Sequence, residues 1–311
     1  MGRPLVIGSR GSKLALWQAE HARSTLHKAD PSLSIKIEVI KTTGDVKTDP
    51  LTVIGGKGVF TKELEDALLD RRIDIAVHSL KDLPTVLPPE LTIAAISERE
   101  DPRDALVLRD STSTSSLLQL PAKAIVGTSS QRRLAQLMAK RPDVIVKDLR
   151  GNVDTRLRKL DEGQYDALIL AAAGLVRLGL AKRISMRITT EEMVPAVGQG
   201  ALGLETRADD HFAIATVMKL DHRETRIACL AERALLKNLG GGCQLPIGAH
   251  GTVSSDLKDL FLIGLVASPD GSKLVRQSIS GSADQPEELG NALATRLRNA
   301  GADELLSTLF V

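Results

Sequence analysis

The chain has 311 residues, of which 42% are hydrophobic and 26% are charged, as is usual for a globular protein with two or three domains. Its 41 basic and 39 acidic side chains leave a net charge of +2, and aromatic residues make up only 2%. This balance excludes an overall basic field, and so few aromatic rings argue against base stacking, so we expect no nucleic-acid partner.

Two cysteines cannot form a disulfide framework, and no cysteine–histidine spacing resembles a zinc site, so we expect a reducing compartment and no metal. The apolar run Leu5–Ile7 is far too short for a signal peptide. No apolar stretch approaches the ~18–20 residues that span a bilayer. We therefore expect a cytoplasmic protein that has no membrane partner.

The first hundred residues predict alternating strands and helices. The spacing of Ala15, Ala19 and Leu26 indicates an amphipathic helix, and Leu64 and Leu68 share one face of another. Such alternation is typical of a largely parallel sheet, whose ligands bind at the carboxyl ends of the strands. Strands are expected over Leu5–Ser9, Ser34–Lys41, Ile73–His78 and Leu91–Ile96.

The pattern restarts after Pro102 and echoes the first half, because residues 6–9 and 125–128 have similar sequences and each lead into a helix. Two similar α/β lobes are therefore expected. Residues 94–97 and the glycine-punctuated segment 195–200 would form a pair of hinge strands between them. The elements expected in the second lobe are strands Ala105–Leu108, Ala124–Gly127, Val144–Leu149 and Ala167–Ala171, an exposed loop Ser111–Ser116 of no assigned function, and helices after Ser130 and over Val153–Leu160.

A different pattern begins at Asp221. Asp221 and Glu224 have the spacing of a helix capping box, and the helix that follows places Cys229 opposite its apolar stripe, exposed or against another domain. The glycines at 240–242 end this helix and lead to Cys243, which such a loop would present rather than bury. From the chemistry alone, a structural cysteine in a tight turn is the alternative. The remaining elements are strands Ile247–Val253, Leu260–Ala267 and Leu274–Ile279 and helices near 287–298 and 302–309.

The expected fold class is α/β, with two lobes joined by hinge strands and a smaller α+β domain at the C-terminus. Residues 1–98 and 197–220 are expected to form the first domain, 99–196 the second, and 221–311 the third.

Three predicted helix starts that follow strands carry arginine, namely Arg10, the pair Arg132 and Arg133, and Arg150 with Arg156. A cation in the first turn of a helix opposes the macrodipole by roughly 0.3–1 kcal/mol, so we infer that bound anions supply the compensation. The planar guanidinium suits carboxylate or phosphate groups, and neighbouring Ser and Thr hydroxyls would complete such a site. Taken singly, each arginine is more often a solvated surface charge.

The segment His78–Asp82 ends a buried strand. Asp82 at this place would stabilise a cation or shuttle a proton, and the alternative is an aspartate that only caps the turn. We interpret His78 as a packed strand histidine rather than a base, and nothing supports Lys81 as a Schiff-base lysine. The glycine loop around Lys57 lacks the spacing of a phosphate loop, although Lys57 could reach an anion from it.

Seven segments of the chain, in the same order, resemble the porphobilinogen deaminase (hydroxymethylbilane synthase) family over nearly the whole length. Seven motifs in register are not expected by chance. Gln131 and Leu80 depart from the residues common in the family, and neither touches the chemistry that the resemblance implies. The segments are Ser9–Leu16, Gly55–Gly58, His78–Asp82, Gly127–Arg133, Leu149–Asn152, Pro195–Gly200 and Gly241–Gly248.

The resemblance implies two lobes akin to type II periplasmic binding proteins, and a third domain with a dipyrromethane cofactor bound to Cys243 through a thioether. It also implies a monomeric enzyme that condenses four porphobilinogen molecules head to tail into the linear tetrapyrrole hydroxymethylbilane, with release of four ammonia. Asp82 would be the catalytic carboxylate. The residues implied to bind the cofactor are Lys57, Lys81, Thr128, Ser130, Arg132, Arg133 and Arg150, and those implied to bind the substrate are Arg10, Ser12, Arg156, Arg177 and Gln199.

A non-enzymatic, two-lobed protein that binds carboxylates or other anions is the alternative, since it would share the lobes and the arginines. Such a protein would normally carry an export signal, and it would have no use for a third domain that presents Cys243. A pyridoxal-phosphate enzyme that uses Lys81 is a weaker alternative, distinguishable by its visible absorbance.

Overall fold

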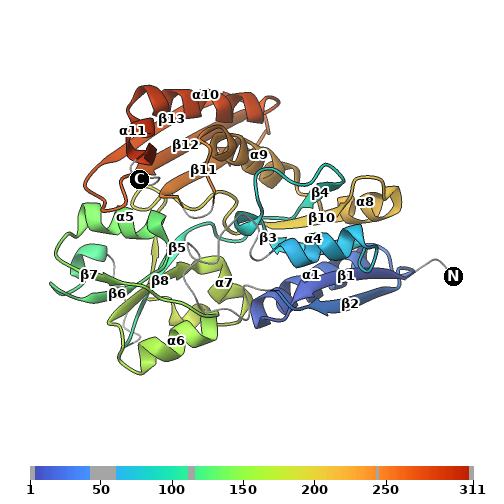
Figure 1. Ribbon diagram of the computed structural model, residues 1–311, viewed down its shortest axis with the longest axis horizontal. Helices are drawn as coiled ribbons and strands as arrows, with labels where there is room; N and C mark the ends of the chain where they lie inside the picture. The colour runs from blue at the N-terminus through green and yellow to red at the C-terminus, as the bar shows by residue number, and fades with distance from the viewer. Residues whose placement is uncertain (1–3, 43–60, 111–115, 243–244, 308–311) are drawn as a thin grey trace. The chain divides into compact units, whose positions relative to one another are not determined.

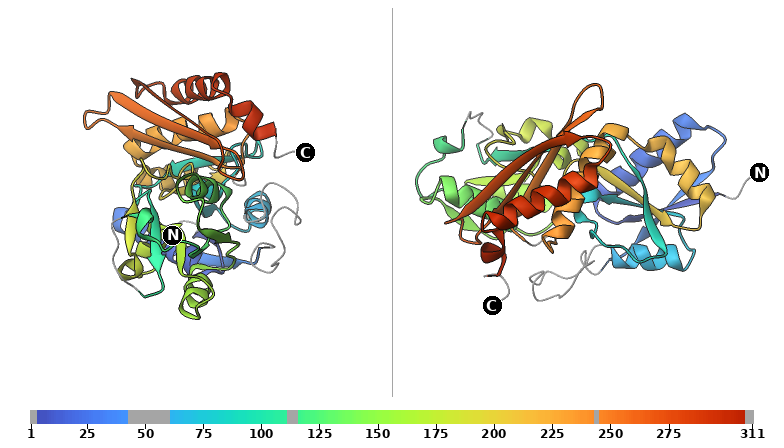
Figure 2. Two further views of the ribbon diagram at one scale, coloured as in Figure 1. Left: turned by 90° about the vertical axis from the view of Figure 1, so that its left-hand side faces the viewer. Right: turned by 90° about the horizontal axis from the view of Figure 1, so that it is seen from above.

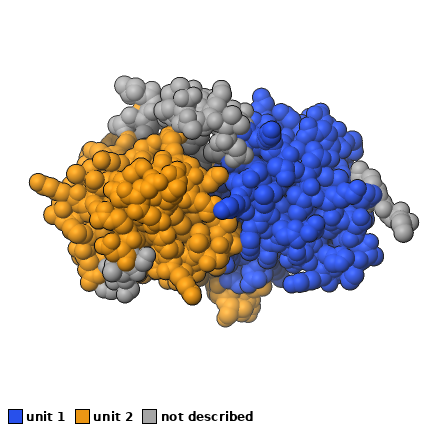
Figure 3. All heavy atoms as spheres, turned by 90° about the horizontal axis from the view of Figure 1, so that it is seen from below, with its two compact units in different colours: residues 1–100, 201–226 blue, residues 101–200, 227–311 orange. Residues whose placement is uncertain are grey.

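Residues 4–42, 61–110, 116–242 and 245–307 are described by the computed structural model of this chain. They form two compact units, residues 1–100 with 201–226 and residues 101–200 with 227–311 (Figure 3). The chain passes between the units after residues 100 and 200, close to the two predicted hinge segments, and again after residue 226. Because the second unit contains two separate sheets, the division into three domains stays a prediction.

The first unit is built on a five-stranded sheet with the strand order β2-β1-β3-β10-β4 (Figure 1). The sheet is largely parallel, as expected, but β10 lies antiparallel between β3 and β4. Its elements are β1 (Leu5–Arg10), α1 (Lys13–Ala29), β2 (Ile35–Ile40), α4 (Lys62–Leu69), β3 (Ile75–Ser79), η1 (Leu80–Asp82), β4 (Leu91–Ile96), β10 (Leu202–Arg207), α8 (His211–Val217) and η4 (Met218–Leu220).

Separate hydrophobic clusters cover the two faces of this sheet. On one face, Leu26 of α1 packs in a cluster with Val77, and on the other face Leu64 of α4 packs in a cluster with Ala76. Both helical stripes predicted from the sequence are thus buried as expected. Because side chains alternate along a strand, His78 lies on the face that α4 covers.

The second unit contains a sheet of the same design, with the strand order β7-β6-β8-β5-β9. Here β6, β7 and β8 are parallel, and β5 is antiparallel to both β8 and β9. The prediction of two similar α/β lobes is therefore confirmed. The elements are β5 (Asp104–Leu108), η2 (Leu117–Gln119), β6 (Ile125–Gly127), α5 (Gln131–Lys140), β7 (Ile145–Lys147), α6 (Val153–Asp161), β8 (Ala167–Ala171), α7 (Ala172–Arg177), η3 (Ala181–Arg183) and β9 (Met186–Ile188).

A three-stranded antiparallel sheet, β11-β12-β13, completes the second unit. Leu235 of α9 and Leu297 of α10 both lie against Gly264 of β12, so the two helices cover one face of the sheet. Figure 2 shows α10 lying along these strands. The smaller α+β domain is confirmed, with elements α9 (Arg223–Asn238), β11 (Ile247–Val253), β12 (Asp259–Ala267), β13 (Leu274–Ser282), α10 (Pro286–Asn299) and α11 (Ala302–Ser307).

The capping box expected at the start of α9 was wrong. Asp221 does not cap this helix, because its carboxylate accepts a hydrogen bond from the Ile96 N–H at 2.8 Å and pairs with Arg226 at 2.7 Å. His222 Nδ1 instead accepts the hydrogen bond of the Thr225 N–H in the first turn. Of the two alternatives for Cys229, exposure is excluded because its side chain is completely buried, and packing against another domain stays a prediction.

Every helix in the described part of the chain falls short of the length and apolar character that crossing a membrane requires.

Candidate active site

Asp82 lies in a short helical turn, η1, at the carboxyl end of β3. Leu80 and Leu83 are buried on either side of the turn, while Lys81 and Asp82 are half-buried. The Leu80 N–H donates a hydrogen bond to the Ala201 carbonyl at 3.0 Å. The turn is thus anchored by its apolar residues and presents the lysine and the aspartate at its surface.

The predicted site residues of the first lobe lie at one edge of the sheet. Arg10 is the last residue of β1, and Ser12 caps α1 by accepting a hydrogen bond from the Ala15 N–H at 3.3 Å. Since β1 and β3 are adjacent parallel strands, their carboxyl ends bring Arg10 and Ser12 to the same edge as Lys81 and Asp82.

Two helix starts in the second lobe are joined by serine hydroxyls. The Ser130 Oγ accepts a hydrogen bond from the Arg133 N–H at 3.4 Å, and the Thr128 Oγ1 accepts one from the Ser130 N–H at 3.3 Å. The Ser129 hydroxyl donates to the Leu149 carbonyl and accepts from the Leu149 N–H. These hydrogen bonds hold the segment before α5 next to the segment before α6. Such an arrangement is needed if the arginines of both helix starts are to bind one anion.

Asp104, which the sequence analysis did not single out, is the centre of a buried cluster in the second lobe. Its carboxylate lies 2.7 Å from the Arg132 Nη1 and 2.8 Å from the Arg133 Nη2. The Gln199 Nε2 donates to the same carboxylate at 2.9 Å. The four residues are between 0% and 6% exposed. The only hint in the sequence is an aspartate at the start of an apolar strand.

The cluster around Asp104 changes the interpretation of the two arginines on α5. Burial alone would raise the pKa of Asp104, but the charges of Arg132 and Arg133 and the hydrogen bonds from Arg132 and Gln199 hold it well below its ordinary value. A carboxylate of the protein, Asp104, thus compensates one of these two arginine charges. Two cations against one carboxylate still leave a formal charge of +1, and contacts of Arg132 and Arg133 with a cofactor stay a prediction.

The other predicted arginines of the second lobe are more accessible. Arg150 Nε donates to the Asp148 carboxylate at 2.7 Å, and both side chains are partly exposed. Arg156 Nε donates to the Gly151 carbonyl at 2.7 Å. These contacts lie at the start of α6.

The second predicted hinge segment is anchored by buried or half-buried side chains of the second unit. Arg132 Nη1 donates to the carbonyl of Val194, the residue just before the segment, at 2.8 Å, and Arg177 Nη2 donates to the Gly200 carbonyl within it at 2.6 Å. The buried carboxylate of Glu232 accepts the Gly198 N–H at 2.7 Å. Arg177, predicted to bind substrate, therefore also holds the end of this segment. Glu232 is a further residue that the sequence analysis missed.

Lys57 and Cys243 lie outside the described residues. Among the described residues, no group of three or more His, Cys, Asp or Glu side chains is arranged to hold a metal ion. Cys229, the other cysteine of the chain, is buried within α9.

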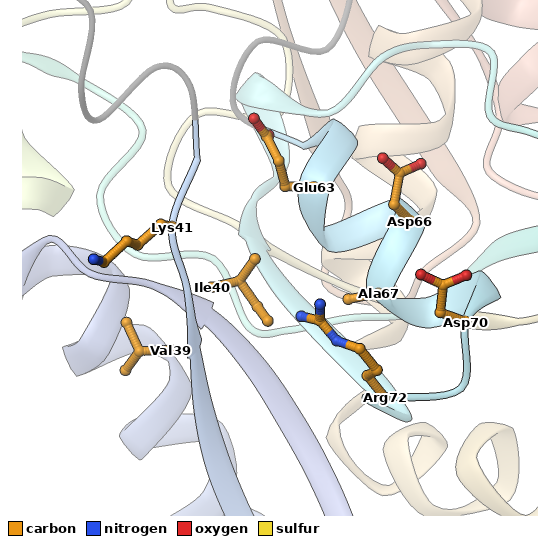
Figure 4. Close-up of a pocket in the computed structure, with 8 residues that line it drawn as sticks. All are labelled: Val39, Ile40, Lys41, Glu63, Asp66, Ala67, Asp70 and Arg72. Carbon is orange, nitrogen blue, oxygen red and sulfur yellow. The ribbon is translucent and has the colours of Figure 1, made fainter.

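A pocket of about 310 Å³ lies in the first unit between the end of β2 and α4 (Figure 4). Three carboxylates from α4 and the residue after it face it, with Lys41 and Arg72 as the cationic lining residues. This charge opposes the binding of a polycarboxylate. The described lining includes none of the predicted site residues, and comprises Val39, Ile40, Lys41, Glu63, Asp66, Ala67, Asp70 and Arg72.

Comparison with known proteins decides the family. Residues 5–215 match "Porphobilinogen deaminase, dipyromethane cofactor binding domain", and residues 226–299 match "Porphobilinogen deaminase, C-terminal domain". The chain belongs to the porphobilinogen deaminase family. A porphobilinogen deaminase of Chromobacterium violaceum is 53% identical over 98% of this chain and 97% of its own. A relative of the same name from Desulforudis audaxviator is 53% identical over 99% of this chain and 98% of its own. Another from a Nostoc species is 50% identical over 99% of this chain and 95% of its own.

The predicted enzyme is therefore confirmed. Porphobilinogen deaminases are hydroxymethylbilane synthases, so the chain is a deaminating transferase of tetrapyrrole synthesis that acts on porphobilinogen. Its cofactor is dipyrromethane, as the matched domain states. The alternative of a non-enzymatic anion-binding protein is not favoured. A solved sulphonate-binding protein of Escherichia coli matches with a TM-score of 0.41 at 14% identity over 76% of this chain and 70% of its own. The fold assignment rests on the sheets described above.

Proposed function

We propose that this chain condenses four porphobilinogen molecules into hydroxymethylbilane with Asp82 as its catalytic carboxylate and Cys243 as the attachment point of dipyrromethane. The observation that carries the proposal is the turn η1, which presents Lys81 and Asp82 beside Arg10 and Ser12 at one edge of the sheet. These cations suit a substrate that carries two carboxylates.

The residues of the second lobe fit a cofactor with acetate and propionate side chains. The Arg132 Nε is buried and has no hydrogen-bond partner among the described residues, which is costly unless a ligand accepts from it. Arg132 and Arg133 leave an excess positive charge around Asp104, which would attract the carboxylates of such a ligand. We assign the cofactor to Lys57, Lys81, Thr128, Ser130, Arg132, Arg133 and Arg150.

When bound, dipyrromethane supplies a pyrrole ring with a free α-carbon to which further rings are added. Asp82 would accept a hydrogen bond from the pyrrole N–H of the substrate and stabilise the positive charge that develops as ammonia leaves. The same carboxylate would then take the proton that the attacking ring loses from its α-carbon. The residues that would bind and orient the substrate carboxylates are Arg10, Ser12, Arg156, Arg177 and Gln199.

Of the two cysteines, Cys243 is the one we assign to the thioether. A thiol must be accessible to act as a nucleophile. Cys229 is 0% exposed within α9, and two pyrrole rings on its sulfur would have to displace the surrounding core. The glycines before Cys243 favour a loop that presents its side chain.

Intact-mass measurement tests this assignment. We expect an added mass of two linked pyrrole units on the wild-type chain and on the matched control Cys229→Ala, and none on Cys243→Ser. An adduct that persists on Cys243→Ser would overturn the attachment point. A wild-type chain that acquires no adduct after incubation with porphobilinogen or preformed hydroxymethylbilane would overturn the proposed mechanism.

We further propose that the enzyme is a cytoplasmic monomer of three domains that binds neither nucleic acid nor membranes. The balanced net charge of +2 and the low aromatic content support the absence of a nucleic-acid partner. A molar mass of 33.3 kDa in light scattering is expected, and twice that value would contradict the monomer.

A further inference from the structure

A buried pair of polar side chains, His78 and Glu205, lies next to the turn that carries Asp82. The His78 Nε2 is 3.0 Å from the Glu205 Oε2, and the two side chains are 4% and 0% exposed. His78 is the next-to-last residue of β3, and Glu205 lies on the neighbouring strand β10. The prediction that His78 is a packed strand histidine is confirmed, and the structure adds its buried partner.

The end of β3 depends on β10 for its position. Within the described residues, β1 forms ladder pairs with β3 at Ile75 and Ala76, whereas β10 pairs with it from Ala76 through Ser79. Glu205 lies opposite Ala76, so it reaches His78 diagonally across the two strands. Within the sheet, the last residues of β3 before Lys81 and Asp82 are therefore paired with β10 alone, and the Ser79 hydroxyl also accepts a hydrogen bond from the Gln18 Nε2 at 2.8 Å.

Strand β10 also contacts the apolar residues on either side of Asp82. Gly203 of β10 lies opposite His78. A Cβ at this glycine would lie 2.8 Å from Leu83 Cδ1 and 3.1 Å from Leu80 Cδ1. The missing side chain thus makes room for both leucines, and the turn η1 sits directly on β10.

Burying the polar side chains of His78 and Glu205 carries a desolvation cost. The Glu205 Oε1 is buried and has no hydrogen-bond partner among the described residues. Glu65 of α4 also faces the pair, and burial, together with the charge of Glu205, raises the pKa of Glu65. A buried polar pair is often no more stabilising than an apolar pair of similar volume, so stability alone does not account for it.

We propose that Glu205 is a positioning residue for the reaction, which orients His78 and thereby holds the end of β3 so that Asp82 keeps its place. Neither side of the pair touches the substrate in this proposal. The inference rests on the proposed role of Asp82. A displaced carboxylate would slow the chemical step more than it weakens binding, since the arginines that bind substrate are unchanged.

The decisive variant replaces the pair by leucines, Glu205→Leu combined with His78→Leu. Because this removes both polar partners together and leaves neither one buried without the other, we expect it to fold with a stability close to that of the wild type. We expect its kcat to fall about tenfold to 100-fold with KM little changed. Rates are divided by the fraction of molecules that carry the adduct in intact mass, so loss of cofactor is not counted as loss of catalysis.

Two further variants separate positioning from stability. Glu205→Gln keeps an oxygen that accepts from His78, and we expect it to retain most of the wild-type kcat. Asp74→Asn changes another buried carboxylate. Asp74 is the residue just before β3, and its carboxylate pairs with Arg207 at 2.8 Å. It is expected to lower stability and to leave kcat per loaded molecule unchanged.

Wild-type kcat in the double leucine variant, or equal losses in Glu205→Gln and the double variant, would overturn the proposal. Asp82→Asn in the same assay separates the two levels of inference. If it keeps the wild-type kcat, the role of Asp82 is wrong. If it loses activity while the double leucine variant does not, only the positioning role is wrong.

Discussion

Replacing Asp82 by asparagine is expected to lower kcat about 100- to 1,000-fold, which corresponds to roughly 2.7–4 kcal/mol of lost transition-state stabilisation. The amide has nearly the same shape, so the buried anchors Leu80 and Leu83 of the turn are not disturbed. What is lost is the negative charge that stabilises the cation formed when ammonia leaves. Steady-state rates per adduct-bearing molecule measure this effect.

The variant is first incubated with preformed hydroxymethylbilane, so that its cofactor does not have to be assembled by the weakened reaction. Asp284→Asn is a suitable control, because Asp284 is an exposed residue of the second unit, and we expect it to keep the wild-type rate. A loaded Asp82→Asn enzyme with a kcat similar to the wild type would exclude Asp82 as the catalytic carboxylate.

Replacing Asp104 by alanine is expected to lower the free energy of unfolding by about 3–5 kcal/mol. The change leaves the guanidinium groups of Arg132 and Arg133 buried without the carboxylate that now lies 2.7 and 2.8 Å away. Gln199 also loses an acceptor. Urea unfolding of the two proteins at pH 7 measures the difference.

Asp161→Ala is the matched control, since Asp161 pairs with Arg183 at 2.6 Å in the same unit but is 50% exposed. An exposed pair of this kind contributes at most about 1 kcal/mol. If the two variants lose the same stability, burial of the Asp104 cluster does not have the effect that we assign to it.

The stability difference between the wild type and Asp104→Ala should also depend on pH. The pKa of Asp104 is held below its ordinary value by Arg132 and Arg133, against the effect of burial. A group with a lowered pKa in the folded state contributes stability above its unfolded pKa, about 3.9 for aspartate, and loses it as the pH falls further. We expect a constant difference from neutral pH to about pH 5 and a smaller one below about pH 4. A difference that grows on acidification would contradict this sign.

Much of the site could be predicted because helix starts and strand ends are local features. Ser12 and Ser130 cap their helices where the sequence placed the helix starts, since a cap depends on a few neighbouring residues. The turn at Asp82 follows its strand for the same reason. The surroundings of Arg132 and Arg133 could not be predicted. No local pattern distinguishes an arginine in the first turn of a helix that binds a ligand from one that pairs with a carboxylate of the protein.

By itself, the sequence determined the family, the strands and helices of two similar lobes, and a smaller third sheet. Periodicity and capping report contacts between near neighbours, and these determine secondary structure. Only the tertiary structure decided that β10 lies between β3 and β4, that Asp104 binds Arg132 and Gln199, and that Glu205 reaches His78. The residues of these three pairs are 28, 95 and 127 positions apart. Burial and charge pairing across such separations depend on the whole fold, so no short stretch of sequence contains them.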